Sequence, residues 1–148
     1  MDQRLRRAIH QKLSGLKVLV VDDMGPNIKN YVYFLSQMGF ERNNITHAKD
    51  GLQGLLKMTK IRPDLILTDW NMPMTDGLQM VKKVRSVTAF KDTPIIMITA
   101  EADKDVKQAA PFVNAVLKKP YTMADVEERI YDALAQYFLK KLKKEPTA

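Results

Sequence analysis

The chain has 148 residues, the length of one ordinary domain, and it has no cysteine, which excludes disulfide bonds, thiolate nucleophiles and cysteine-based metal sites. The formal net charge is +7, but residues 1–17 carry +4 and residues 129–148 carry +3, while residues 18–128 hold 14 positive and 14 negative side chains. No apolar run approaches the ~20 residues of a membrane span, and none follows the basic start, so we expect a cytoplasmic protein without a signal peptide.

Two kinds of apolar segment alternate along the chain. The runs at 17–21, 65–68, 94–99 and 115–117 are rich in Val, Ile and Leu without polar alternation, which is typical of parallel strands buried on both faces. Other segments repeat apolar residues every three or four positions, as helices do. In chain order we expect a helix at 3–13, a strand at 17–21, a helix at 28–38, a weak strand at 44–48, a helix at 51–60, a strand at 65–68, a helix at 76–85, a strand at 94–99, a helix at 103–110, a strand at 115–117 and a long helix at 122–144.

Several helix ends carry recognisable signals. Gly39 follows the last apolar residue of one helix, and Pro63 and Pro111 follow two others. Thr122 and Asp125 have the spacing of a capping box, in which each side chain bonds the other residue's backbone. These signals support the helix boundaries that the periodicity predicts.

The alternation predicts an α/β protein built as a (βα)5 unit. Because crossovers between parallel strands are right-handed, we expect a doubly wound parallel sheet with an extra N-terminal helix. We divide the chain into a helical extension at 1–14, a main domain at 15–140 and a basic C-terminal tail at 141–148.

Polar residues stand where the predicted strands end. Ligands of such a sheet bind at the carboxyl ends of its strands, where we expect Asp22, Asp23, Asp69, Thr99 and Lys119 to converge. Three adjacent carboxylates repel one another, and Mg²⁺ relieves this repulsion with oxygen ligands. An Asp beside Mg²⁺ can take up a phosphoryl group as an aspartyl-phosphate, while a lysine and a hydroxyl hold the phosphoryl oxygens. The alternative is that single Asp residues only cap the following helices.

The motifs around these positions resemble those of response-regulator receiver domains of the CheY-like chemotaxis type. The resemblance spans roughly residues 16–140 and implies a flavodoxin-like sheet with the strand order 2-1-3-4-5. It is carried by Val20-Val21-Asp22-Asp23, Leu67-Thr68-Asp69-Trp70-Asn71-Met72-Pro73, Asp76-Gly77, Ile98-Thr99-Ala100-Glu101-Ala102 and Lys119-Pro120.

The resemblance implies a role for each site residue. Asp69 is the phosphoacceptor, Thr99 donates a hydrogen bond to the phosphoryl group, and Lys119 pairs with it. The implied Mg²⁺ ligands are Asp23, helped by Asp22, together with Asp69 and the main-chain carbonyl of Asn71.

Further features of the pocket follow from the same resemblance. Asn71 and Glu101 stand where side chains modulate dephosphorylation, and an exposed loop acid is the alternative for Glu101. Lys119-Pro120 is expected to be a cis peptide. Lys118 is a rival for the phosphate contact, but the Lys-Pro spacing and strand alternation favour Lys119.

The sequence departs from this family pattern on one side. Receivers of this type often carry a switch aromatic three residues before the Lys, where this chain has Val116. The segment from Thr99 to Lys119 is short, and Pro111 interrupts its helix. We therefore expect a remodelled partner-docking face.

The leading functional hypothesis is a stand-alone receiver that acts through partners. A histidine kinase or histidine phosphotransfer protein would phosphorylate Asp69, and phosphorylation would change the affinity for a downstream protein, with chemotaxis as one pathway. A phosphorelay intermediate or phosphate sink is the alternative, which the missing switch aromatic favours. We expect no enzyme activity beyond its own phosphorylation and dephosphorylation.

Two other classes of function have less support. An Mg²⁺-dependent phosphohydrolase often has a general acid two residues after its nucleophile, where Asn71 stands, and an amide cannot serve as an acid or base. Nucleic-acid binding through the basic ends is not favoured, because helix-turn-helix signals and interleaved aromatics are missing. We expect no membrane insertion.

The two terminal helices raise the question of a homodimer. Their apolar residues recur every four positions beside basic residues, which fits docking or dimerisation through these helices. The alternative is that they pack on the domain's own surface.

Overall fold

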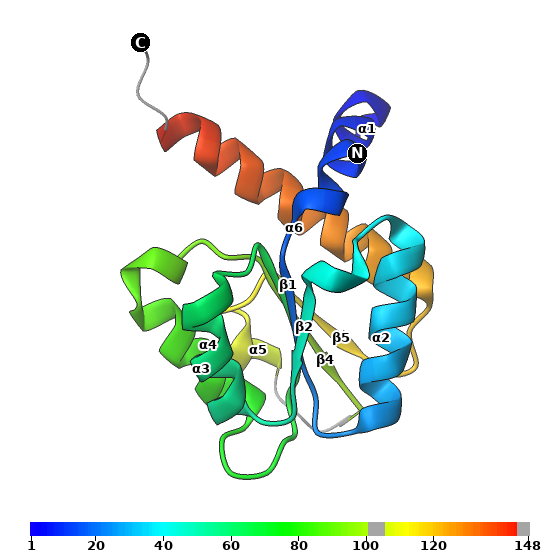
Figure 1. Cartoon of the computed structure of the whole chain (residues 1–148). Coiled ribbons are helices and arrows are strands. Elements are labelled where there is room, and N and C mark those ends of the chain that lie inside the picture. Colours follow the sequence, from blue (N-terminus) through cyan, green and yellow to red (C-terminus); the bar gives the residue numbers. More distant parts are fainter. Residues whose placement is uncertain (101–105, 145–148) are drawn as a thin grey trace.

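A single parallel sheet forms the centre of the molecule (Figure 1). The computed structural model describes residues 1–100 and 106–144, and its 5 strands lie in the order β2-β1-β3-β4-β5. The doubly wound α/β fold and its strand order are thereby confirmed. The strands are β1 (Val18–Val21), β2 (Ile45–Ala48), β3 (Leu65–Asp69), β4 (Ile95–Thr99) and β5 (Ala115–Lys118).

Helices connect these strands, as the periodicity predicts. They are α1 (Gln3–Lys12), α2 (Gly25–Met38), α3 (Gly51–Ile61), α4 (Gly77–Ser86), α5 (Val106–Ala109) and α6 (Met123–Lys144), with short 3₁₀ turns at Leu13–Gly15, Arg42–Asn44 and Thr88–Phe90. Helix α2 begins three residues earlier than predicted, because Pro26 is accommodated in its first turn. Residues 103–105 of the predicted fourth crossover helix lie outside the described residues.

The helices cover both faces of the sheet, and the two cores follow from strand alternation (Figure 1). Val18 and Val20 face the core shared with α1, α2 and α6. Leu19 and Val21 point the opposite way, into the core shared with α3, α4 and α5. Because successive side chains of a strand point to opposite faces, strands buried on both sides need unbroken apolar runs.

The predicted capping signals are present at the helix ends. Gly39 ends α2 with a φ of 123°, a conformation that costs glycine little. The Thr122 amide donates to Asp125 Oδ2 at 3.0 Å, and the Asp125 amide donates to Thr122 Oγ1 at 3.1 Å. A second capping box, which we did not predict, joins Asp76 and Gln79 at the start of α4.

Helix α1 packs on its own domain, at the end of the molecule opposite the carboxyl ends of the strands (Figure 1). Ile9 is 1% exposed and belongs to the core shared by α1, α2 and α6. Arg6 forms an ion pair of 3.0 Å with Glu127 and lies 3.9 Å from the ring centre of Tyr131. The apolar stripe of α1 is therefore covered within the chain, and homodimerisation stays a prediction.

Arg85, on α4, joins the loop before β4 to the loop before β5. The Arg85 guanidinium donates to four backbone carbonyls, and burial lowers its pKa. The acceptors and distances are Phe90 (3.0 Å), Lys91 (3.2 Å), Thr93 (2.7 Å) and Phe112 (2.8 Å).

In the described part of the chain, no helix is both long and apolar enough to cross a membrane.

Candidate functional site

Three carboxylates meet at the carboxyl edge of the sheet. Asp22 and Asp23 follow β1, Asp69 ends the neighbouring β3, and one oxygen from each lies within 4.8 Å of the others. Asp22 is only 1% exposed, Asp69 is partly buried and Asp23 is exposed. The clustering that we predicted from strand ends is therefore present.

A glycine permits the tight loop next to Asp69. The Gly77 amide donates to the Trp70 carbonyl at 2.7 Å, so the start of α4 lies directly on the end of β3. A side chain at Gly77 would collide with the Asp69 carbonyl oxygen. Glycine is required here because two backbone segments touch, and the contact fixes the base of the loop that follows Asp69.

Burial and mutual repulsion perturb the carboxylates. Burial first, and then the Asp22 charge, raise the pKa of Asp69 to about 6, although the backbone amides of Trp70 and Asn71 oppose the rise. The Trp70 amide donates to Asp69 Oδ1 at 2.8 Å. Burial likewise raises the pKa of Asp22, against a donated hydrogen bond from the Met24 amide at 2.9 Å.

These pKa shifts indicate which ligand the cluster suits. Asp22 and Asp69 resist ionisation, and a hard divalent cation held by the three carboxylates would offset their repulsion. The residues present therefore fit Mg²⁺. Asn71, whose carbonyl we expect to contribute, follows Trp70 and is partly buried.

Thr99 and Lys119 come from β4 and the loop after β5, on the side of Asp69 away from β1. Thr99 ends β4 and is 0% exposed, and its carbonyl accepts the Lys119 amide at 2.8 Å. The Lys119 charge opposes the rise that burial causes in the pKa of Asp22, so its ammonium lies within electrostatic range of the cluster. Among the described residues, that ammonium forms no ion pair with Asp69.

The rival lysine and the loop peptide can also be placed. Lys118 pairs in register with Thr99 as the last residue of β5, while Lys119 starts the following loop. The Lys119–Pro120 peptide is cis, as expected. Glu101, the second predicted modulating residue, lies outside the described residues.

One polar contact at the site was missed by sequence reasoning. The Asn27 side-chain amide donates to Asp22 Oδ2 at 3.3 Å and lies 3.5 Å from Oδ1. Asn27 is in the first turn of α2, and a lone Asn near a helix start has no motif that distinguishes it from a surface residue. Only the path of α2 across the end of β1 brings it to the carboxylate.

Val116, at the position of the expected switch aromatic, lies on β5, and the remodelled docking face stays a prediction. Val116 is partly buried and packs against the core shared with α3, α4 and α5. Because it is a valine, this position has no aromatic side chain that could move between two orientations. The described part of the preceding helix, α5, ends at Ala109, two positions before Pro111.

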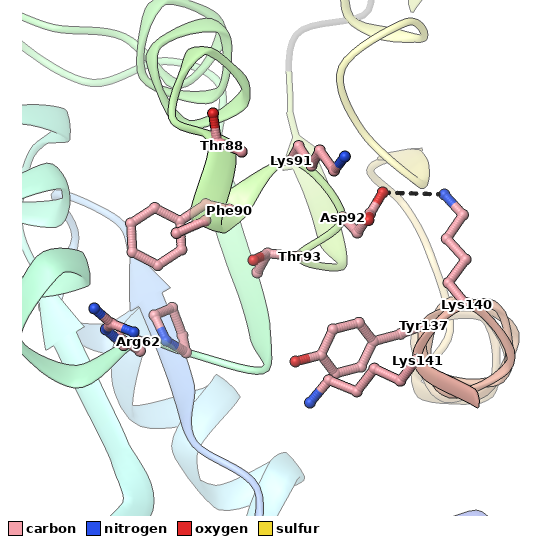
Figure 2. Close-up of a pocket in the computed structure, with 11 residues that line it drawn as sticks. Arg62, Thr88, Phe90, Lys91, Asp92, Thr93, Tyr137, Lys140 and Lys141 are labelled. Carbon is pink, nitrogen blue, oxygen red and sulfur yellow. Dashed lines mark hydrogen bonds and ion pairs between the residues drawn. The ribbon is translucent and has the colours of Figure 1, made fainter. Parts of the chain in front are cut away.

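A basic pocket lies away from the carboxylates. It has a volume of about 250 Å³ and is lined by residues of the α3–β3 turn, the loop before β4, and α6 (Figure 2). Lys140 and Lys141 contribute from α6, and Lys140 lies 3.4 Å from Asp92 Oδ1. Part of the surplus positive charge of the C-terminal segment is therefore held here, remote from Asp69.

Comparison with known proteins agrees with this geometry. The family model of the response regulator receiver domain matches residues 18–131. The chain is 36% identical over 118 residues to chemotaxis protein CheY-3 of Vibrio cholerae, covering 78% of this chain and 89% of the relative. It is also 36% identical over 118 residues to chemotaxis protein CheY1 of Helicobacter pylori, covering 78% of this chain and 94% of that protein.

Solved structures give the same result. A response regulator receiver domain protein from Clostridium thermocellum superposes with a TM-score of 0.75 at 25% identity, covering 84% of this chain and 98% of that one. CheY4 of Vibrio cholerae superposes with a TM-score of 0.71 at 32% identity, covering 80% of this chain and 98% of that one.

Proposed function

This chain belongs to the response regulator receiver domain family, as a receiver of the CheY type, and on that premise we propose that it is a phosphorylation switch with Asp69 as the phosphoacceptor. Receivers of this kind are signalling proteins and not enzymes in the usual sense. The observation that carries the proposal is the position of the Asp69 carboxylate, at the end of β3, within 4.8 Å of the Asp22 and Asp23 carboxylates.

The proposed donor is a histidine kinase or a histidine phosphotransfer protein. An Asp69 carboxylate oxygen attacks phosphorus while the P–N bond to the donor histidine breaks and its electron pair returns to the imidazole. With a pKa of about 6, Asp69 is mostly ionised at neutral pH and can act as the nucleophile. The Trp70 amide holds Oδ1 and so orients the carboxylate.

The neighbouring residues complete the proposed mechanism. Asp22, Asp23, Asp69 and the Asn71 carbonyl would hold Mg²⁺, which when bound neutralises charge on the carboxylates and phosphoryl oxygens. Thr99 would donate a hydrogen bond to a phosphoryl oxygen, and Lys119 would pair with another. Asn71 and Glu101 would set how easily water reaches the phosphoryl group.

Phosphorylation would then change the affinity for a protein partner. The CheY-type relatives make a chemotaxis response regulator the first candidate. Val116 in place of a switch aromatic favours the second candidate, a phosphorelay intermediate or phosphate sink. Binding of an output protein by the phosphorylated form separates the two, because a sink passes its phosphoryl group to water or to a donor without binding an output partner.

The proposal is tested by phosphorylation with a small donor. Wild type, Asp69→Asn and the control Asp50→Asn, in which Asn can still cap α3, are incubated with Mg²⁺ and acetyl phosphate and analysed by intact mass spectrometry. We expect a phosphoryl adduct on wild type and the control and none on Asp69→Asn. An adduct of equal yield on Asp69→Asn would disprove the assignment.

A further inference from the structure

Helix α2 contacts both sides of the phosphorylation site. Asn27 and Tyr31 are four residues apart, so they share one face of the helix. The Asn27 amide donates to Asp22 on the metal side, at 3.3 Å from Oδ2. The Tyr31 hydroxyl lies 3.2 Å from the hydroxyl of Tyr121, on the lysine side. One turn of α2 thus joins a carboxylate after β1 to the loop after β5.

The tyrosine pair is enclosed and close to the carboxylates. Tyr31 is 5% exposed and Tyr121 is partly buried. Burial is the main cause that raises the pKa of Tyr31, and pairing with Tyr121 and the charges of Asp22 and Asp69 add to it. A buried hydroxyl that loses its partner keeps its desolvation penalty, so the pair resists separation.

The loop that carries Lys119 needs such an anchor. Its strand, β5, is at the edge of the sheet, with β4 as its one neighbour in the sheet order. The Lys119 amide bonds the Thr99 carbonyl at 2.8 Å before the chain leaves the sheet. Tyr121 is two residues further, and its hydroxyl supplies the second attachment, to a helix instead of a strand.

We propose that Tyr31 and Tyr121 are positioning residues whose hydroxyl pair holds the Lys119 loop at a set distance from the Asp22–Asp69 carboxylates. This inference rests on the proposed function, because Lys119 is positioned for the phosphoryl group on Asp69. Lys119 is exposed, and its long side chain can reach many places. The backbone must therefore be fixed for its ammonium to meet the phosphoryl oxygens, and small displacements slow such reactions markedly.

The test compares isosteric variants that remove only hydroxyl groups. Tyr31→Phe, Tyr121→Phe and the double variant are compared with wild type, and Tyr33→Phe is the control on the same helix because Tyr33 is 60% exposed. Trp70 is the single tryptophan, and its backbone amide donates a hydrogen bond to Asp69 Oδ1. Its fluorescence should therefore change when Mg²⁺ or a phosphoryl group binds beside Asp69. We measure the phosphorylation rate with acetyl phosphate at saturating Mg²⁺, and separately the Mg²⁺ dissociation constant.

We expect each single variant to be phosphorylated about 3- to 10-fold more slowly than wild type, with an Mg²⁺ dissociation constant within about twofold. The double variant should be no slower than the slower single variant, because both substitutions remove one shared contact. The control should react like wild type.

Three results would overturn the inference. The first is rates within about twofold of wild type in both single variants, which would leave the pair a structural role alone. The second is slowing matched by an equal loss of Mg²⁺ affinity, which would place the defect in the carboxylates. The third is equal slowing in Tyr33→Phe. If wild type itself does not react, or Asp69→Asn reacts equally, the proposed function fails first, and the inference fails with it.

Discussion

Replacing Asp69 by Asn should stabilise the metal-free protein while abolishing its phosphorylation. In the native state Asp69 ionises with a pKa of about 6, against an ordinary value of 3.8. One pKa unit corresponds to about 1.4 kcal/mol, so an ionised Asp69 costs at most about 3 kcal/mol of folding stability. Because the side chain keeps some contact with water, we expect Asp69→Asn to raise the free energy of unfolding by about 1–3 kcal/mol near pH 8.

The pH dependence has a defined sign. A carboxyl group whose pKa is raised by folding binds more protons in the native state than in the unfolded state, so stability falls as pH rises between the two pKa values. Wild type should therefore become less stable from about pH 4 to about pH 6, relative to Asp69→Asn. Below about pH 4 the carboxyl is protonated in both states, and the advantage of the variant should disappear.

The assay is urea unfolding followed by circular dichroism in EDTA, from pH 4 to pH 8. Glu128→Gln is the matched control, since it removes one negative charge from an exposed position on α6. A ligand at 100 times its dissociation constant stabilises by about 2.7 kcal/mol, so added Mg²⁺ should stabilise wild type more than a variant that lacks one carboxylate. An Asp69→Asn protein no more stable than wild type in EDTA near pH 8, or an advantage undiminished at pH 4, would refute the argument.

Three further predictions concern the frame of the site. Ile9→Ala should lower the free energy of unfolding by about 2–4 kcal/mol, because Ile9 is 1% exposed and the substitution leaves a cavity. Urea titration measures the change, and a loss below about 1 kcal/mol would mean that α1 is not part of the core. Asp76→Ala should cost about 1 kcal/mol by removing the cap of α4, while Asp76→Asn should cost much less, and equal costs would argue against capping. Arg85→Met should lower the free energy of unfolding by about 2–4 kcal/mol, because four backbone carbonyls lose their donor. It should also speed amide hydrogen exchange in the loop at 88–93, and unchanged exchange would show that Arg85 does not hold that loop.

Strand ends and the cap of α6 were predictable because their signals are local. Unbroken apolar runs identify buried parallel strands, and in such a sheet every strand ends at the same edge. These two facts place Asp22, Asp23 and Asp69 at one edge, and the strand order that the resemblance implied makes β1 and β3 neighbours, so that the three carboxylates converge. The capping pair of Thr122 and Asp125 also follows from spacing, since the three-residue separation is a property of the helix itself.

Other contacts depend on where whole elements lie. The bond of Asn27 to Asp22 needs the first turn of α2 to pass over the end of β1, and no spacing in the sequence reports that path. The pairing of Tyr31 with Tyr121 joins residues 90 positions apart. The sequence suggested docking or self-packing for the apolar stripe of α1, and burial of Ile9 in the domain core showed self-packing.

The charge distribution shows the same division. The sequence alone determined that residues 18–128 are neutral and that the excess lies at the two ends, because charge is a sum over residues. Only the tertiary structure decided where that excess goes: Arg6 stacks on Tyr131, and Lys140 and Lys141 line a pocket remote from Asp69. Periodicity and composition are properties of the chain, whereas contacts between distant segments depend on how the packed helices are placed on the sheet.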